Sequence, residues 1–538
     1  MTFEQIMQSE KFVPNMEQRP VIESVRNTVV SAGAGAGKTA VLSWRFLRLV
    51  MEEKVRPDQI LTLTFTKKAA NEMRQRIYQR LIKAKDSIPQ DSLDSFRKAT
   101  ISTLDSFCAQ IVRSDSISYG FSRDMGNLSE EDLSDMAQRL AQGFLSDPDN
   151  REESSLLASL DMPPAIMNGF FLTIASKVSL AGDYNADRIS RVFVETVRKV
   201  YLAKRTRLGE LLDRLGAMSL RGAFANQYDR IRYLFDSQSF TSSDYFDLRG
   251  VKDEEVKELV GEIKPILGKD TGFPILQDIA NGSTQTPVLQ RAVEKFANLV
   301  NSEKRRLGVM TFRDVSELSV LALRDNLQLR SVYKNHFRFI MIDEFQDNNR
   351  VQRDLLFLLA ERTDIPGEKG RIPALEDLDR NKLFFVGDEK QSVYSFRGAD
   401  VSVFRHLQQE IGVNGDSLSL STNYRSQKKL IDHFNDVFSQ VLSEGERDYH
   451  ARYNPILCGR KPDGTRSRII FSVYNKNAIE DEDMDGGILE AEAIGDYCKK
   501  ILQTDEFLVD GKRPEPEDIA IIFRSSTNQM NIEKALPL

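Results

Sequence analysis

The stretch NTVVSAGAGAGKTAVL, residues 27–42, decides the fold of this chain. Its TVVS segment predicts a β-branched strand, and TAVLSWRFLRLVMEEK, which begins at Thr39, predicts an amphipathic helix. Between them lies AGAGAGKT, which follows the phosphate-loop pattern G-x-x-x-x-G-K-[ST] with Ala32 in place of the first Gly. A helix N-terminus presents free backbone amides to an anion, so this strand, loop and helix together predict a nucleotide-binding site.

The glycines of the loop supply the backbone freedom that close approach to phosphate requires. Lys38 is expected to reach the β and γ phosphates of ATP, and the Thr39 hydroxyl to bind Mg²⁺. The alternative is a Gly/Ala-rich turn with a chance Lys-Thr pair, and the loop alone names no task, because many unrelated activities use it. The predicted nucleotide-binding residues of the loop are Ala32, Gly33, Ala34, Gly35, Ala36, Gly37, Lys38 and Thr39.

A second candidate part of the site lies in HFRFIMIDEFQD, residues 336–347, an apolar strand-like run that ends in two carboxylates. Adjacent carboxylates at a buried strand end are costly unless a cation compensates them. Asp343 is therefore expected to hold Mg²⁺, and Glu344 is the candidate general base that orients the attacking water. A helix N-terminus that merely prefers acidic residues is the alternative.

Asp343 lies 305 residues beyond Lys38, yet one Mg-nucleotide must contact both, so a whole domain is expected to be inserted between parts of one sheet. Between 116 and 306 the pattern is helical and charged, whereas strand-like runs lie on either side of it. These runs are ILTLTFT (60–66), ATIST (99–103) and RNKLFFVGD (380–388). We therefore predict an α/β fold, a RecA-like doubly wound parallel sheet with a large helical insertion and the start of a second RecA-like domain. The expected boundaries are 1–115, 116–306, 307–420 and 421–538.

The bulk composition limits the alternatives. A chain of 538 residues exceeds one hydrophobic core, and its net charge of −6 confines any nucleic-acid contact to a local groove. The three cysteines have no C-x-x-C spacing, so no disulfide framework or cysteine-based metal site is expected. With no signal peptide or membrane-spanning run in the sequence, we expect a cytoplasmic protein without a membrane partner.

Seven motifs in fixed order make the prediction specific. They are NMEQRPVI, AGAGAGKT, TLTFTKKAANEMRQRI, ISTLDSFC, MIDEFQD, FFVGDEKQSVYSFRGAD and LSTNYRSQ. Over residues 15 to 430 this set resembles the superfamily 1A DNA helicases of the UvrD/Rep type, and the wording GDEKQSVYSFRGAD resembles the RecB and AddA branch.

The resemblance implies roles for further residues of the nucleotide site. Gln18 would read the adenine edge, Tyr424 would stack on the base, and Gln391 would sense the γ-phosphate. Arg425 would be the arginine finger that stabilises charge on the transferred phosphoryl group. Since such an arginine belongs to a second domain, hydrolysis would be tied to closure of a cleft.

The resemblance also implies a path for single-stranded DNA. Phe65, Tyr394 and Phe396 would form aromatic platforms, and Thr66 and Ser106 would support the backbone. The alternative for Phe65 and Phe396 is an ordinary place in the core. The family often has His where this chain has Asp105, so no DNA role is assigned to that residue.

Near its end the sequence predicts strands at 467–474 and 518–525 and a helix at 488–502, too little for a complete second RecA-like sheet. The later motifs of the family are expected to be missing, either because the chain is the N-terminal part of a longer protein or because it is a genuine short protein. The leading hypothesis is an ATP-dependent DNA helicase or translocase, 3′ to 5′ by resemblance, that uses ATP and Mg²⁺ in repair or recombination. Its DNA would be single-stranded or a duplex with a single-stranded tail, and a nuclease/helicase subunit is a possible partner. The alternative is a component of a larger complex that binds nucleotide and DNA without translocating.

Overall fold

The structure is a computed structural model that contains two compact units, Met1–Pro462 and Asp463–Leu538. Within the parts of the chain that it describes, no helix is both long and apolar enough to cross a membrane. The described residues are 1–159, 164–182, 186–241, 243–246, 251, 253–268, 272–281, 286–394, 398–442, 453–461, 468–471, 486–508, 512–523 and 525–536.

A parallel sheet of six strands forms the centre of the first unit, in the order β3-β2-β6-β7-β1-β8. The phosphate-loop strand β1 lies between β7 and β8, and the chain crosses the sheet repeatedly, which confirms the predicted RecA-like α/β class. β8 was not predicted, because its sequence DSLSL alternates polar residues with only two leucines. The strands are β1 (Thr28–Ala32), β2 (Ile60–Thr64), β3 (Ile101–Thr103), β6 (Phe339–Ile342), β7 (Leu383–Gly387) and β8 (Asp416–Leu420).

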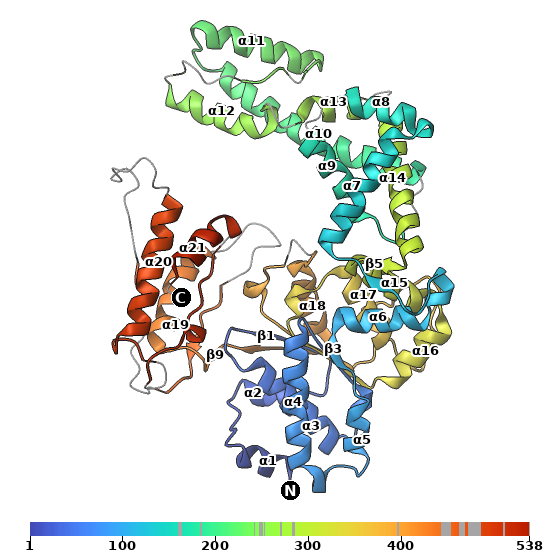
Figure 1. Cartoon of the computed structure of the whole chain (residues 1–538), viewed down its shortest axis with the longest axis vertical. Helices are drawn as coiled ribbons and strands as arrows, with labels where there is room; N and C mark the ends of the chain where they lie inside the picture. Colours follow the sequence, from blue (N-terminus) through green and yellow to red (C-terminus); the bar gives the residue numbers. More distant parts are fainter. Residues whose placement is uncertain are drawn as a thin grey trace. The chain divides into compact units, whose positions relative to one another are not determined.

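Helices cover both faces of this sheet (Figure 1). Because strand side chains alternate between faces, neighbouring residues of one strand enter different cores. In β7, Phe385 packs with one set of helices, whereas Phe384 and Val386 pack with the other. The first set is α6 (Leu104–Ser114), α15 (Phe312–Asp325), α17 (Arg350–Ala360) and α18 (Val401–Asn414), and the second is α1 (Phe3–Ser9), α2 (Gln18–Glu23), α3 (Lys38–Met51) and α4 (Lys67–Lys83).

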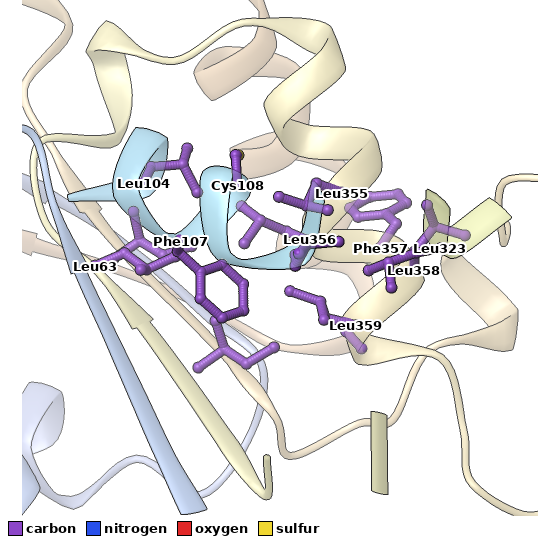
Figure 2. Close-up of a cluster of buried hydrophobic side chains, with 14 of the residues drawn as sticks. Leu63, Leu104, Phe107, Cys108, Leu323, Leu355, Leu356, Phe357, Leu358 and Leu359 are labelled. Atoms are coloured by element: carbon purple, nitrogen blue, oxygen red, sulfur yellow. The ribbon is translucent and has the colours of Figure 1, made fainter. Parts of the chain in front are cut away.

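Figure 2 shows the first of these two cores. Leu63 from β2 lies against Phe107 of α6, and the run Leu355–Leu359 of α17 completes the cluster. All of these residues are buried, and burying a side chain of this size contributes roughly 1.5–3 kcal/mol. This packing fixes the ends of β2, β6 and β7, where the candidate site residues lie. The remaining helices of the first unit outside the insertion are α5 (Ser92–Arg97), α16 (Leu327–His336) and α19 (Lys428–Val441).

A helical insertion separates β3 from β6, as the sequence predicts, and is coloured cyan to yellow-green in Figure 1. It has two hydrophobic cores of its own, one among α7, α9 and α14 and one among α10 to α13. At its base the short strands β4 (Gly126–Asn127) and β5 (Val309–Met310) pair in parallel. Its helices are α7 (Glu130–Ser146), α8 (Arg151–Ser159), α9 (Pro164–Lys177), α10 (Ala186–Gly216), α11 (Gly222–Ser237), α12 (Glu254–Leu267), α13 (Phe273–Ala280) and α14 (Thr286–Leu307).

A fully buried ion pair joins the insertion to the sheet domain. Lys304, near the end of α14, lies 2.9 Å from Asp314 in the first turn of α15, and neither side chain is exposed. Lys304 Nζ also donates to the carbonyl of Val178, and Asp314 accepts the amide of Leu180 at 2.7 Å. One charged pair thus holds together three segments from the base of the insertion.

In the second unit the predicted helix forms as α20 (Gly486–Gln503), followed by α21 (Gln529–Ala535). The strand predictions for 467–474 and 518–525 are wrong for the residues that the structure describes, since 468–471 and 519–523 have no strand assignment. Their apolar side chains remain largely exposed, with Ile522 at 93%. A β-branched run forms a strand only beside a partner strand, and among the described residues no strand is paired with either segment. The rest of 467–474 lies outside the described residues.

In the first unit, a separate two-stranded sheet is formed by β9 (Thr422–Asn423) and β10 (Leu457–Cys458), which pair in parallel.

Replacing Lys304 tests the buried pair. Lys304→Met leaves the Asp314 carboxylate buried without its cation, so we expect a loss of about 3–5 kcal/mol in the free energy of unfolding. The measurement is the urea midpoint for loss of helical circular dichroism. Arg306→Met, which removes an exposed cation paired with Glu303 on the same helix, serves as the control and is expected to leave the midpoint almost unchanged, because solvent screens the pair. Equal midpoints for the two variants would contradict the assigned role of the pair.

Candidate functional site

The phosphate loop lies between the end of β1 and the start of α3. Gly35 and Gly37 have φ angles of 69° and 85°, a region that L side chains rarely adopt. A Cβ on Gly35 would also lie 2.6 Å from Asn423 Nδ2, so this position excludes a side chain twice over. Ala32 is the last residue of β1, and extended backbone accepts any side chain, which explains why it can replace the first Gly.

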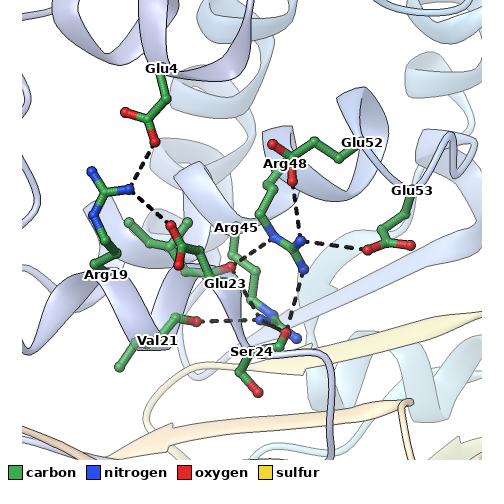
Figure 3. A network of polar contacts seen from close by, with 10 residues as sticks. Glu4, Arg19, Val21, Glu23, Ser24, Arg45, Arg48, Glu52 and Glu53 are labelled. Carbon is green, nitrogen blue, oxygen red and sulfur yellow. Dashed lines mark hydrogen bonds and ion pairs between the residues drawn. The ribbon is translucent and has the colours of Figure 1, made fainter.

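Gln18 contacts the loop from the side. Its Nε2 donates to the carbonyl of Ala36 at 3.4 Å, and its backbone amide donates to Asn15 Oδ1 at 2.7 Å. The buried guanidinium groups of Arg45 and Arg48 on α3 bind carbonyls at the end of α2, Arg45 to Ser24 at 2.6 Å (Figure 3). Helix α2, which begins at Gln18, is therefore fixed against the helix that begins at the phosphate loop.

Lys38 and Glu344 form an ion pair at the carboxyl ends of β1 and β6, two strands that are separated by β7. Lys38 Nζ lies 2.9 Å from Glu344 Oε2, and the Lys38 side chain is only 10% exposed. Glu344 follows β6 and has a φ of 54°, an uncommon conformation for a residue with a side chain. Because β1 and β6 are parallel, their carboxyl ends reach the same edge of the sheet. Lys38 and Glu344 are therefore close in space although they are far apart in the sequence.

Asp343 lies directly beside this pair and is buried. Burial, followed by the charge of Glu344, raises the pKa of Asp343 to about 7, while Lys38 opposes the rise. A buried carboxylate destabilised in this way is suited to a bound cation. Together with the Thr39 hydroxyl in the first turn of α3, it provides oxygen ligands of the kind Mg²⁺ prefers. The residues present therefore fit a Mg²⁺ site whose other ligands would be phosphate and water.

Gln391 follows β7 at the same edge. Its Nε2 donates to Asp388 Oδ2 at 2.8 Å, and Asp388 also forms an ion pair with Lys390 at 3.0 Å. β7 neighbours both β1 and β6, so the turn that carries Gln391 lies beside the carboxyl ends of both strands.

The last residue of β8 and the segment that follows it pack directly on the phosphate loop. Leu420 accepts the amide of Gly33, Asn423 Nδ2 donates to Ala34, and the amide of Tyr424 donates to Gly35. Asn15 Nδ2 donates to the Tyr424 hydroxyl at 2.7 Å. Tyr424 is therefore close to the Gln18 side of the loop. The exposed side chain of Arg425 starts beside Gly35, where a Cβ would lie 2.9 Å from Arg425 Cβ.

The structure brings two of the predicted DNA-binding aromatics together. The rings of Phe65, after β2, and Tyr394, after β7, have centroids 4.5 Å apart, and both residues are partly exposed. Thr66 caps α4 by accepting the amide of Ala69, and its side chain is exposed. Ser106 is also exposed, and its hydroxyl bonds that of Thr103 at 2.7 Å. Phe396 lies outside the described residues.

Two buried amide side chains in the site were missed by sequence reasoning. Gln346 bonds Glu344 at 2.9 Å and accepts the amide of Asp388 at 2.8 Å. Asn423 bonds the phosphate loop and accepts the amides of Arg425 and Ser426, both at 2.8 Å. Gln346 lies in MIDEFQD and Asn423 in LSTNYRSQ, so their presence in these motifs could have marked them as candidate site residues. Their contacts, however, are with residues distant in sequence, which the pattern could not reveal.

A strand, a phosphate loop, a facing pair of carboxylates and a parallel sheet define a RecA-like P-loop protein. A family model described as the UvrD/REP helicase N-terminal domain matches residues 14–412. The chain therefore belongs to the UvrD/REP helicase family, and the resemblance inferred from its motifs is confirmed.

Similar curated proteins are named as subunits of an ATP-dependent helicase/nuclease. The protein from Listeria welshimeri is 26% identical over 95% of this chain and 47% of its own length. That from Listeria monocytogenes is 25% identical over the same shares, and that from Acetivibrio thermocellus is 27% identical over 79% of this chain and 39% of its own. The chain thus spans about half the length of the curated relatives it matches.

The loop geometry predicts a contrast between two glycines. Gly35→Ala introduces a side chain at positive φ, at a cost of roughly 1–2 kcal/mol, and also a contact with Asn423. Gly33→Ala is the matched control, because its nearest neighbour would be Leu420 O at an ordinary 3.5 Å. We expect a lower urea midpoint for the Gly35 variant alone. A control as destabilised as the Gly35 variant would contradict the described packing.

Proposed function

We propose that this chain is the ATP-hydrolysing, DNA-binding portion of an ATP-dependent DNA helicase or translocase. The observation that carries the proposal is the intact Lys38–Glu344 pair at the edge of the sheet that also presents Phe65 and Tyr394. A phosphate-binding loop and an aromatic platform on one rigid sheet allow nucleotide and DNA to affect each other. The UvrD/REP family membership supports the same activity.

In this proposal each residue acts on ATP in a defined way. Lys38 leaves Glu344 and binds the β and γ phosphates, which frees the Glu344 carboxylate to orient the attacking water. Gln391 senses the γ-phosphate. Arg425, which starts beside Gly35, turns toward the phosphoryl group and stabilises its charge.

Gln18 and Tyr424 would hold the base. The amide of Gln18 offers a donor and an acceptor to the adenine edge, and the Tyr424 ring stacks on it. Thr39 and Asp343 would hold Mg²⁺, which when bound neutralises charge on the β and γ phosphates. The protein groups place water and phosphate in line for transfer.

The proposed DNA substrate is single-stranded DNA or a duplex with a single-stranded tail. Aromatic stacking at Phe65 and Tyr394 tolerates any sequence, and Thr66 and Ser106 present exposed hydroxyls for the backbone. Phe396 is proposed as a third platform. Movement would run 3′ to 5′ and serve repair or recombination, on the strength of the family resemblance.

A partner protein with nuclease or helicase activity is also proposed, because the similar proteins are named as subunits of a helicase/nuclease. Since DNA is the proposed substrate, the compartment of action would be that of the chromosome, the cytoplasm in bacteria such as those in which these relatives occur.

The proposal predicts ATP hydrolysis that depends on DNA. We expect single-stranded DNA to stimulate ATP turnover strongly, and Glu344→Gln to lower kcat by roughly 10²- to 10⁴-fold while ATP still binds. Lys38→Ala should lose both binding and turnover. Phosphate release and binding of a fluorescent ATP analogue measure the two effects, and the exposed Glu72→Gln on α4 serves as a control without effect.

A rate that is the same with and without DNA would exclude the motor. Nucleotide and DNA binding without turnover would instead support the alternative, a non-translocating component of a larger complex.

The aromatic platform predicts a loss of DNA affinity. Phe65→Ala is expected to weaken binding of oligo-dT by roughly 1–3 kcal/mol, because one base loses its stacking surface. Fluorescence anisotropy of labelled oligo-dT at fixed salt measures the change. The control Tyr78→Ala removes an exposed aromatic of α4 that stacks on Phe96 and is expected to bind DNA normally. Unchanged affinity in the Phe65 variant would remove this residue from the DNA path.

A further inference from the structure

Gln346 is a buried polar side chain that lies between the nucleotide site and the aromatic pair. It lies in the 3₁₀ turn Phe345–Asp347 and is 1% exposed. Its Nε2 donates to Glu344 Oε2 at 2.9 Å and to Asp347 Oδ2 at 3.1 Å. Its Oε1 accepts the amide of Asp388 at 2.8 Å. The orientation of the amide follows from the backbone N–H of Asp388, which can only donate and therefore faces the amide oxygen.

The same residue is tied to the segment that leads to the aromatic platform. Its carbonyl accepts the Ser392 hydroxyl at 3.2 Å, two residues before Tyr394. Its Oε1 binds the start of the turn that carries Gln391. A Cβ on Gly387 would lie 2.8 Å from Gln346 Oε1, so the end of β7 and this amide are in direct contact. Displacement of the segment 388–394 must therefore move Gln346 or break its bonds.

Glu344 Oε2 has two donors in this structure, Lys38 and Gln346, both at 2.9 Å. Under the proposed function Lys38 turns toward the phosphates when nucleotide binds. Among the residues that the structure describes, Gln346 then remains as a hydrogen-bond donor to the Glu344 carboxylate. Glu344 also has a φ of 54°, an uncommon backbone conformation for a residue with a side chain.

We infer that Gln346 is a positioning residue that orients Glu344 toward the attacking water and links this orientation to the segment that carries Tyr394. The inference rests on the proposed function and adds a route by which DNA at the Phe65–Tyr394 pair alters ATP turnover. The route runs from the Phe65–Tyr394 pair along the chain to Ser392, two residues before Tyr394. Ser392 bonds Gln346, and Gln346 bonds Glu344.

The test compares two substitutions at this residue in the full chain. Gln346→Met has a similar size and removes all side-chain hydrogen bonds. Gln346→Glu keeps the oxygen that accepts from Asp388 but replaces the donor to Glu344 by an acceptor. Because the new carboxylate is buried beside Glu344 and Asp347, its charge also costs stability, so turnover is compared per folded nucleotide site. A purely structural role predicts that turnover per folded site in Gln346→Glu is close to wild type, because the tie to β7 is preserved. The positioning role predicts that both variants lose turnover.

The expected result is a split between kcat and KM. With saturating single-stranded DNA, kcat falls on the order of 10- to 100-fold in both variants, as misplacing a catalytic group does. The KM for ATP and the Kd for oligo-dT stay within about threefold, since Lys38 and the aromatic pair are untouched. Gln277→Leu is the matched control, a buried amide of the insertion that is also 1% exposed, and its kcat is expected to be unchanged.

The outcomes separate this inference from the function on which it rests. Wild-type protein without DNA-stimulated turnover overturns both. Stimulated turnover in wild type together with unchanged kcat in Gln346→Glu overturns the role of Gln346 alone. A loss of total turnover that is fully accounted for by fewer nucleotide sites also overturns it, because turnover per folded site is then that of the wild type. If Gln346→Met fails to fold, Gln346→Glu decides alone.

Discussion

The contact between Lys38 and Glu344 is the constraint on which the rest of the structure depends. It joins the loop after β1 to the residue after β6, and it requires both strands to run in the same direction in one sheet. In a parallel sheet every carboxyl end reaches one edge, so polar residues that follow different strands gather there. Lys38, Glu344, Gln391 and Phe65 all follow this rule. The site residues named here therefore share the carboxyl edge of the sheet.

The parallel sheet also limits where the ends of the insertion can lie. Because the sheet must be completed by strands on both sides of some two hundred intervening residues, the insertion has to leave and return at neighbouring points. The paired strands β4 and β5 and the buried Lys304–Asp314 pair provide this closure. The insertion has separate hydrophobic cores, so its own packing does not disturb the sheet. The site residues described above all lie in the sheet domain, outside the insertion.

The sequence predicted the elements with strong local signals. The strands β1, β2, β6 and β7 are apolar and buried on both faces, and the long helices α7, α14 and α20 show clear periodicity. It failed where a strand depends on a neighbour. β8 has a weak pattern but forms because β1 pairs with it, whereas 519–523 has a strong pattern and no paired strand in the described structure. Strand formation is a pairwise property, and the pattern of one segment contains only half of it.

The sequence by itself determined the class of site: the phosphate loop, the paired carboxylates and the ordered motifs each need only local residue identity. Tertiary structure decided which side chains touch. It placed Gln18 against Ala36, Tyr424 against Asn15, and Phe65 against Tyr394, and it introduced Gln346 and Asn423 as links between motifs. The physical reason is that hydrogen bonds and ring contacts act over a few ångströms in space. Residues hundreds of positions apart come within that range only after the parallel sheet has formed.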